Sequence, residues 1–180
     1  MNSIDKFSNL LLEEAKRFLE KAKHEKDDVG QVAFCHASLL LGFSSLEAHM
    51  NALSEELALR SSLDILTKSI LLEKEFRLDK GRFELTAALK MYRLEDKLEF
   101  LFANFSMSAQ QPQADWWGDL KNGMQLRNRL VHPKESLPLT TEQTGRCLEA
   151  IVECLNALYL AVFKKPHPSN KRKLNSNLGF

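Results

Sequence analysis

The first 111 residues contain no proline. Proline interrupts a helix because it lacks the backbone N–H and its ring clashes with the preceding turn. The chain also has 32 leucines against 5 valines and 4 isoleucines, whereas strands favour β-branched residues and their turns favour glycine and proline. Together these features predict an all-α protein built from long, uninterrupted helices.

Apolar residues recur at steps of three and four along most of the chain, which is the period of an amphipathic helix. This spacing predicts a single-domain bundle of five or six main helices without a β-sheet. The helix over 31–58 is apolar on so much of its circumference that we expect it at the centre. The expected helices cover residues 3–26, 31–58, 63–76, 83–105, 116–132 and 141–162, with a turn at 79–81 and a loop at 106–115.

Charge is distributed unevenly along the chain. Residues 164–180 carry five lysine or arginine residues and no acid, so the overall charge of +1 leaves residues 1–163 at −4. A basic, polar end of this kind is typical of a disordered tail. We therefore expect a helical domain over 1–163 and a disordered tail over 164–180. Because the body lacks a general basic excess, any contact with RNA must be local or involve the tail.

The sequence lacks the motifs that mark several classes of enzyme. The chain has no GxxxxGK[ST], GxGxxG, HExxH or GxSxG motif, which disfavours triphosphate hydrolysis, dinucleotide chemistry, zinc proteolysis and α/β-hydrolase chemistry. The five histidines show no paired metal-ligand spacing, so we expect neither metal nor cofactor. Cys35, Cys147 and Cys154 include no CxxC pair and are expected to act as small core residues.

The chain shows no sign of export or membrane insertion. Its apolar runs are shorter than the ~20 residues that span a bilayer, and its N-terminus lacks the order of a secretory signal. An odd number of cysteines fits a reducing compartment. We therefore expect a cytoplasmic protein with no membrane partner.

The segment RNRLVHP, from Arg127 to Pro133, stands out from the solvated helix faces around it. Arg127 follows Leu120 by seven residues and Met124 by three, which places it on the apolar stripe of its own helix. A guanidinium is rarely buried there unless it is paired or faces a wet cleft.

His132 lies five residues after Arg127, about 140° further round an ideal helix. Pro133 favours a helix end at His132, from which the imidazole can swing back toward Arg127. A cation that holds a phosphate would then share a cleft with a group that titrates near pH 6.5, as metal-free phosphodiester cleavage requires. A purely structural explanation is also open, because both side chains can cap carbonyls at a helix end.

The RNRLVHP segment resembles the motif of the HEPN superfamily, small all-helical domains that occur as prokaryotic toxins and defence ribonucleases. Their motif is an arginine, commonly followed by a polar residue, and then a histidine after four to six positions. Arg127, Asn128 and His132 match it with four residues between the arginine and the histidine. The resemblance extends over residues 1–163 by helix order and length, including the LEDKLEFL stretch.

The resemblance implies a homodimer in which two such motifs face each other across a composite cleft and cleave RNA without a metal. By position in the motif, Arg127 would hold the phosphate, His132 would act as general base or acid, and Asn128 would orient the phosphate or the imidazole. An antitoxin protein is the partner implied for the toxins among these domains.

Ser44, Glu47 and Asn51 lie three and four residues apart on the apolar helix over 31–58, so they share a face. Family members often place a polar residue of this helix near the cleft, and Glu47 is positioned to pair with Arg127. The three residues equally suit an exposed strip or a buried hydrogen-bond network.

Two classes of function remain from the sequence. One is a HEPN-like RNA-binding domain and endoribonuclease, the toxin of a toxin–antitoxin or defence system. The other is a non-catalytic helical module for dimerisation or protein interaction. Trp116 and Trp117 suit base stacking in the first class, but the start of a leucine-rich helix favours packing anchors. They also offer apolar surface for a dimer interface.

Overall fold

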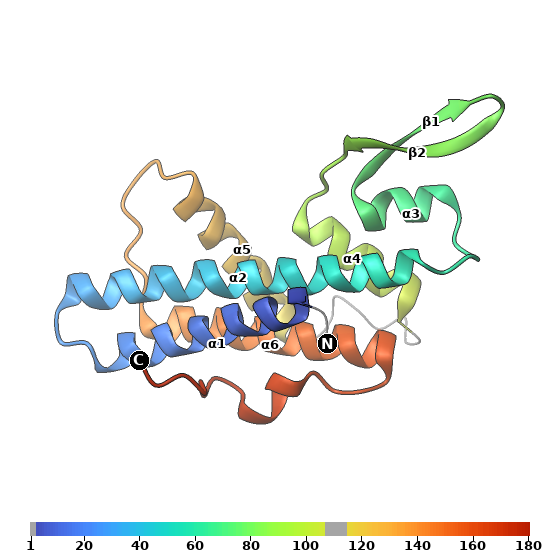
Figure 1. The fold of residues 1–180 in the computed structure, drawn as a ribbon. Helices are drawn as coiled ribbons and strands as arrows, with labels where there is room; N and C mark the ends of the chain where they lie inside the picture. The colour runs from blue at the N-terminus through green and yellow to red at the C-terminus, as the bar shows by residue number, and fades with distance from the viewer. Residues whose placement is uncertain (1–2, 107–114) are drawn as a thin grey trace.

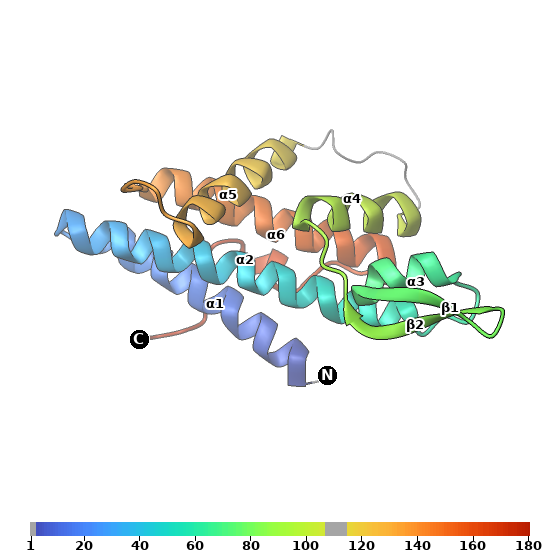
Figure 2. The same ribbon diagram turned by 90° about the horizontal axis from the view of Figure 1, so that it is seen from above.

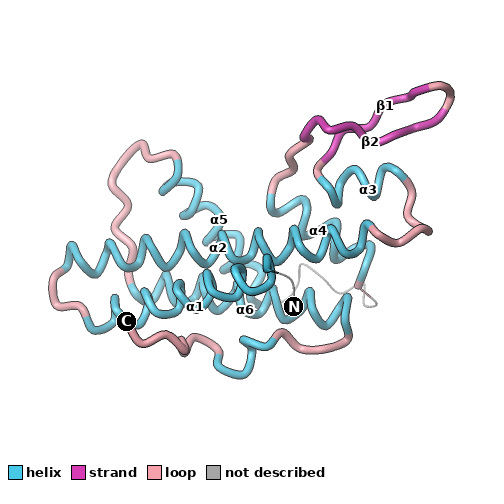
Figure 3. The backbone as a smooth tube through the Cα atoms, viewed as in Figure 1, coloured by secondary structure: helices cyan, strands magenta, loops and turns pink. Residues whose placement is uncertain are grey.

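The computed structural model describes residues 3–106 and 115–180, so most of the loop expected at 106–115 lies outside the described residues. The described residues form six α-helices, a two-stranded antiparallel sheet and a short 3-10 helix (Figures 1 and 3). A mostly helical protein is confirmed, whereas a bundle without a β-sheet is wrong. The order is α1 (Ser3–His24), α2 (Asp28–Ala58), α3 (Ile65–Leu72), β1 (Lys74–Asp79), β2 (Arg82–Leu89), α4 (Leu94–Phe105), α5 (Asp115–Val131), α6 (Thr141–Phe163) and η1 (Pro168–Arg172).

Helix α2 is the central element, as its apolar circumference predicted. It packs against α1, α3, α5 and α6, and Leu39, Phe43 and Leu46 on it are at most 2% exposed. Figures 1 and 2 show α1 and α6 alongside α2, with α4 and α5 next to α6. Among the described helices, only α2 has the length and hydropathy that a membrane span needs, and here its buried side chains belong to the core.

Residues 63–105 depart from the two helices expected there. Helix α3 ends at Leu72, and Glu73 adopts the left-handed conformation with φ of 50°, which turns the chain into β1. Lys80 and Gly81 have φ of 47° and 80° in the turn that joins β1 to β2. Positive φ at both central positions suits a tight hairpin turn. The turn expected at 79–81 is therefore confirmed, but it connects strands rather than helices.

The hairpin sequence explains this difference. Phe76 and Leu78 alternate with polar residues on β1, and Phe83 and Leu85 do so on β2, so a period of two fits the segment as well as a helical period. The two phenylalanine rings pack across the hairpin with centroids 5.9 Å apart. Figures 1 and 2 show the hairpin projecting from the helical body next to α3.

Several local predictions near α5 and α6 are confirmed. Thr140 and Gln143 form the expected capping box, with the Thr140 hydroxyl accepting from Gln143 N at 3.1 Å. Trp117 is 6% exposed and Trp116 packs against Phe102 at 6.2 Å between ring centroids, so both tryptophans are packing anchors. This burial removes Trp117 as exposed apolar surface for a dimer, whereas Trp116 is only partly buried.

The three cysteines are free and buried, as expected for core residues. Burial is the main reason that the pKa of the Cys147 thiol rises to about 11. Such a thiol stays protonated near neutral pH and is a poor nucleophile.

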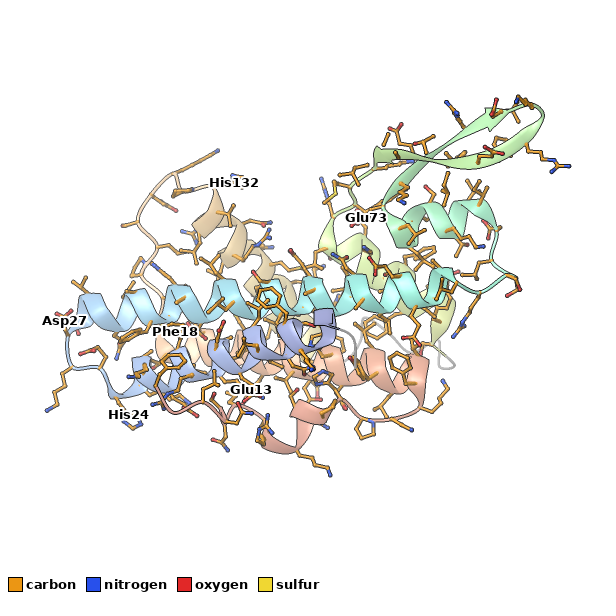
Figure 4. The ribbon with its side chains drawn as sticks, in the orientation of Figure 1. Glu13, Phe18, His24, Asp27, Glu73 and His132 are labelled. Atoms are coloured by element: carbon orange, nitrogen blue, oxygen red, sulfur yellow. The ribbon has the colours of Figure 1, made fainter. Side chains whose placement is uncertain are left out.

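The tail expected over 164–180 is instead an ordered segment that lies along α1 (Figure 1). Arg172 Nη2 donates to Glu13 Oε1 at 2.7 Å, and the backbone N–H of Asn177 donates to Glu13 Oε2 at 2.8 Å. Ser176 N donates to Glu20 Oε1 at 2.8 Å. One of the five basic residues that suggested disorder, Arg172, thus pairs with an acid of α1. Figure 4 shows Glu13 on the side of α1 that faces this segment.

Glu13 lies in a buried charge network. Burial alone would raise the pKa of its carboxyl, but hydrogen bonds from Arg172 and Asn177 and the charge of Lys16 outweigh burial, so the pKa lies below its usual range. Lys16 is fully buried, and its Nζ lies 3.2 Å from Glu13 Oε1. This network attaches the C-terminal segment to α1.

Candidate functional site

A cleft of about 620 Å³ lies between α2, α4 and α5, next to the segment that joins β2 to α4. Glu47 and Asn51 line it from α2, and Arg127 and Asn128 line it from α5. Four of the six residues singled out in the sequence therefore share one cleft, although α2 and α5 are far apart in the chain.

Arg127 is held by two acceptors at the wall of the cleft. Its Nη2 donates to Glu47 Oε1 at 2.9 Å, which is the pairing that the sequence predicted. Its Nη1 donates to Asn128 Oδ1 at 3.2 Å. The Arg127 side chain is 32% exposed and that of Glu47 36% exposed, so the pair is accessible from solvent. A pair this exposed adds little stability but fixes the direction of the guanidinium.

Gly123, one turn before Arg127, allows α5 to approach α2 closely. A Cβ atom at Gly123 would lie 2.9 Å from Cζ of Phe43 and 3.2 Å from Cβ of Cys147, both tighter than ordinary contacts. The absent side chain therefore brings the backbone of α5 against α2. This approach places Arg127 within reach of Glu47.

Lys97 is a cleft residue that sequence reasoning missed. It lies on α4, is 2% exposed, and donates from Nζ to Asn51 Oδ1 at 2.9 Å. The same Nζ lies 3.2 Å from Glu73 Oε2. A signal was present, because Lys97 follows Leu94 by three residues and precedes Leu101 by four, on the apolar stripe of its helix. The same criterion singled out Arg127.

Lys97 fixes the orientation of Asn51. An ammonium group only donates, so the amide atom that faces Lys97 is the oxygen and the NH₂ group of Asn51 points elsewhere. Asn51 is exposed and lines the cleft. The cleft thus offers N–H donors from both Asn51 and Arg127.

The cations of the cleft are mostly paired. Arg127 and Lys97 are paired as described above. In addition, Lys121 Nζ on α5 lies 2.9 Å from Glu95 Oε1 on α4. Arg93 also lines the cleft and has no ion pair among the described residues. An anion that enters must therefore compete with carboxylates, in keeping with the acidic body of the chain.

His132 does not join Arg127 in the cleft, so the shared site expected within one chain is not formed. Its backbone N–H donates to Asn128 O at 2.9 Å in the last turn of α5, and its side chain is exposed. Figure 4 shows His132 at the far end of α5, away from α2. Five residues of helix separate it from Arg127 by about 140°, and the helix end does not reverse that angle.

Ser44 also lies outside the cleft. It is exposed on α2, one turn before Glu47, and does not line the cavity. Its place on the helix is consistent with the exposed-strip interpretation that the sequence left open.

No group of three or more His, Cys, Asp or Glu side chains within residues 3–106 and 115–180 is arranged to hold a metal ion. The cleft holds carboxylates and amides, but each described cleft carboxylate of Glu47, Glu73 and Glu95 faces a cation. Its chemistry is therefore that of paired charges and N–H donors.

No protein-family model, no curated protein and no solved structure matches this chain. Membership of the HEPN superfamily therefore stays a hypothesis carried by the RNRLVHP segment.

Proposed function

We propose that this chain is a HEPN-like RNA-binding domain that cleaves RNA without a metal ion, as a homodimer in the cytoplasm. The observation that carries the proposal is the guanidinium of Arg127, fixed by Glu47 and Asn128 at the wall of an open cleft. A preorganised cation with free N–H groups suits a phosphodiester, whose charge grows in the transition state.

In this mechanism an RNA 2′-hydroxyl loses its proton to a base and attacks the neighbouring phosphorus. The bond from phosphorus to the 5′-oxygen breaks, and that oxygen takes up a proton. Arg127 holds the non-bridging phosphate oxygens, Asn128 orients the guanidinium through its side-chain oxygen, and His132 transfers a proton.

The position of His132 supports the need for a second copy. Within one chain His132 lies outside the cleft that holds Arg127, and its exposed side chain is accessible to another molecule. In a homodimer, the imidazole of one copy can approach the phosphate held by the other. Such an interface is isologous, so two cleavage sites would form together.

We therefore expect a homodimer in solution. Light scattering coupled to size exclusion should give a mass of twice 20.6 kDa at micromolar concentration. A mass near 20.6 kDa under conditions in which RNA is cleaved would contradict the composite site.

The toxin or defence role follows from the same resemblance. A toxin of this kind is held inactive by an antitoxin protein, and a protein that covers Arg127 at the cleft wall would block the phosphate. The partners we propose are therefore a second copy, an RNA substrate and an antitoxin.

A specific observation favours the second class of function, a non-catalytic helical module for dimerisation or protein interaction. Leu78, Phe83, Leu89 and Met91, on or directly after the hairpin, are 59–73% exposed. Exposed apolar groups that project from the body are typical of interaction surfaces.

The two classes are separated by incubating purified wild type and His132→Ala with a mixed RNA pool in EDTA. We expect the wild type to degrade the pool, because the proposed mechanism uses no metal. Loss of a general acid or base slows a reaction about 10²–10⁴-fold, so His132→Ala should be nearly inactive. If both proteins leave the RNA intact, or both degrade it equally, the interaction module is the better assignment.

A further inference from the structure

The segment between β2 and α4 also lines the cleft that holds Arg127. It contributes Met91, Tyr92 and Arg93 to the cavity, and Leu94, the first residue of α4, follows them there. Met91 is 73% exposed, and Tyr92 and Leu94 are partly buried. A methionine, a tyrosine ring and an arginine thus line the cleft next to one another on one short stretch of chain.

The segment that carries Tyr92 is anchored at its start. The backbone N–H of Lys90 donates to Glu73 O at 2.8 Å, and the carboxylate of Glu73 is held by buried Lys97. Lys90 Nζ also lies 5.6 Å from the centroid of the Tyr92 ring. Because the chain next to Tyr92 is anchored, less freedom is lost when a ligand packs on the ring.

We propose that Tyr92, with Met91 beside it, forms a subsite for an unstacked nucleobase of single-stranded RNA. The subsite rests on the proposed function, since it takes the base of a nucleotide whose phosphate is held at Arg127. Lys90 covers one face of the Tyr92 ring, and the base stacks on the other. Arg93, which has no ion pair among the described residues, meets the adjacent backbone phosphate.

Three physical features favour this ligand. A cavity of about 620 Å³ lies within the range of small-ligand sites, so it suits one nucleotide rather than a duplex. Single-stranded RNA is bound by aromatic rings on which bases stack, together with cations that follow the backbone. Both kinds of group, Tyr92 and Arg93, occur here on one short segment that lines the same cleft as Arg127.

The test measures binding without cleavage, in the His132→Ala protein with EDTA. Fluorescence anisotropy gives the Kd for a labelled single-stranded RNA and for the same RNA with abasic residues. Tyr92→Ala should weaken binding of the intact RNA about 5- to 150-fold, the range found when a stacking side chain is truncated. Tyr92→Phe keeps the ring and should bind like the parent.

The abasic RNA separates stacking from a structural effect. If a base stacks on Tyr92, the parent and Tyr92→Ala should bind the abasic RNA equally well. Phe7→Ala is the matched control, because Phe7 is an aromatic residue on α1, 58% exposed, that does not line the cleft. It should leave both Kd values unchanged.

Failure of the subsite and failure of the proposed function give different results. If RNA binding depends on Arg127 but Tyr92→Ala binds as tightly as the parent, the subsite is wrong and the proposed function stands. Weakening of intact and abasic RNA by the same factor also overturns the subsite, because the ring would then act only on the fold. If the parent binds no RNA, both the proposed function and the subsite are wrong.

Discussion

Replacement of Arg127 by alanine is expected to slow RNA cleavage roughly 100- to 1,000-fold, the loss typical for one preorganised group that stabilises transition-state charge. Arg127 is suited to this role because Glu47 and Asn128 already fix its guanidinium before a phosphate arrives. No reorganisation is then needed as charge builds on the phosphate oxygens. The measurement is a single-turnover rate on a defined RNA, with EDTA present.

Arg129→Ala is the control on the same helix. Arg129 points roughly 200° away from Arg127, and its Nη2 pairs with Glu135 Oε1 at 2.7 Å. Its side chain is 51% exposed, so its loss should leave both the fold and the cleavage rate close to those of the wild type. If Arg129→Ala and Arg127→Ala slow cleavage equally, general charge attraction explains the activity better than a fixed phosphate contact does.

The double variant tests whether Arg127 and His132 act in one step. Residues that act as a unit lose most of their effect with the first substitution, so the two losses should not multiply. Mixing Arg127→Ala protein with His132→Ala protein adds a second readout, because a composite site should regain activity in the mixed dimer. Multiplied losses together with no recovery on mixing would contradict a shared site.

Local sequence signals were sufficient for most of the helices. The capping box at Thr140 and Gln143 fixes the start of α6, and the helical period fixes the core faces of α1 and α2. The hairpin was missed because the sequence of this segment fits the alternating pattern of a strand as well as it fits the period of a helix. In the structure α3 ends at the left-handed residue Glu73, where the sequence has neither of the residues, glycine and asparagine, that usually mark such an end.

The candidate site, too, was predictable only where a local sequence signal was present. The pair of Arg127 and Glu47 was predictable because each is a charged residue on an apolar helix face, where a charged side chain is rarely found without a partner. His132 lies outside the cleft because five residues of helix turn it about 140° from Arg127, and the helix end beside Pro133 did not bring the imidazole back. The C-terminal segment was misjudged because its partners, Glu13 and Glu20, are more than 150 residues away.

The second large effect concerns His167, which lies in this C-terminal segment and is 1% exposed. The ring Nδ1 accepts from the backbone N–H of Ser169 at 3.3 Å as the cap of η1. An N–H only donates, so Nδ1 carries no proton and the neutral ring is protonated at Nε2. The ring packs edge-on against Tyr159 and His49, with centroids 4.5 and 4.9 Å away.

Burial is the main cause that lowers the pKa of His167 to about 3, and electrostatic interactions with His49 and Lys16 lower it further, against an opposite effect of Glu13. In the unfolded chain the imidazole titrates near 6.5. The unfolded state therefore binds a proton between these two values while the folded state does not. The stability that neutral His167 contributes is complete above about pH 6.5 and is lost as the pH falls toward 3.

The free energy of unfolding should therefore fall below pH 6.5 with a slope of at most about 1.4 kcal/mol per pH unit from this residue. Urea unfolding of the wild type and of His167→Asn at pH 7, 6 and 5 measures it. Asparagine retains an oxygen that can accept from Ser169 N but has no group that titrates. The range above pH 5 also precedes most of the protonation of Glu13, whose lowered pKa shifts its own loss of stability to more acidic solution.

We expect His167→Asn to be less stable than the wild type at pH 7, because a smaller side chain leaves space beside Tyr159, and to lose less stability between pH 7 and 5. The two curves should therefore converge as the pH falls. Parallel curves would mean that His167 is protonated to the same extent in both states, so that the ring is not buried as a neutral cap. A wild-type curve that is flat over this range would have the same meaning.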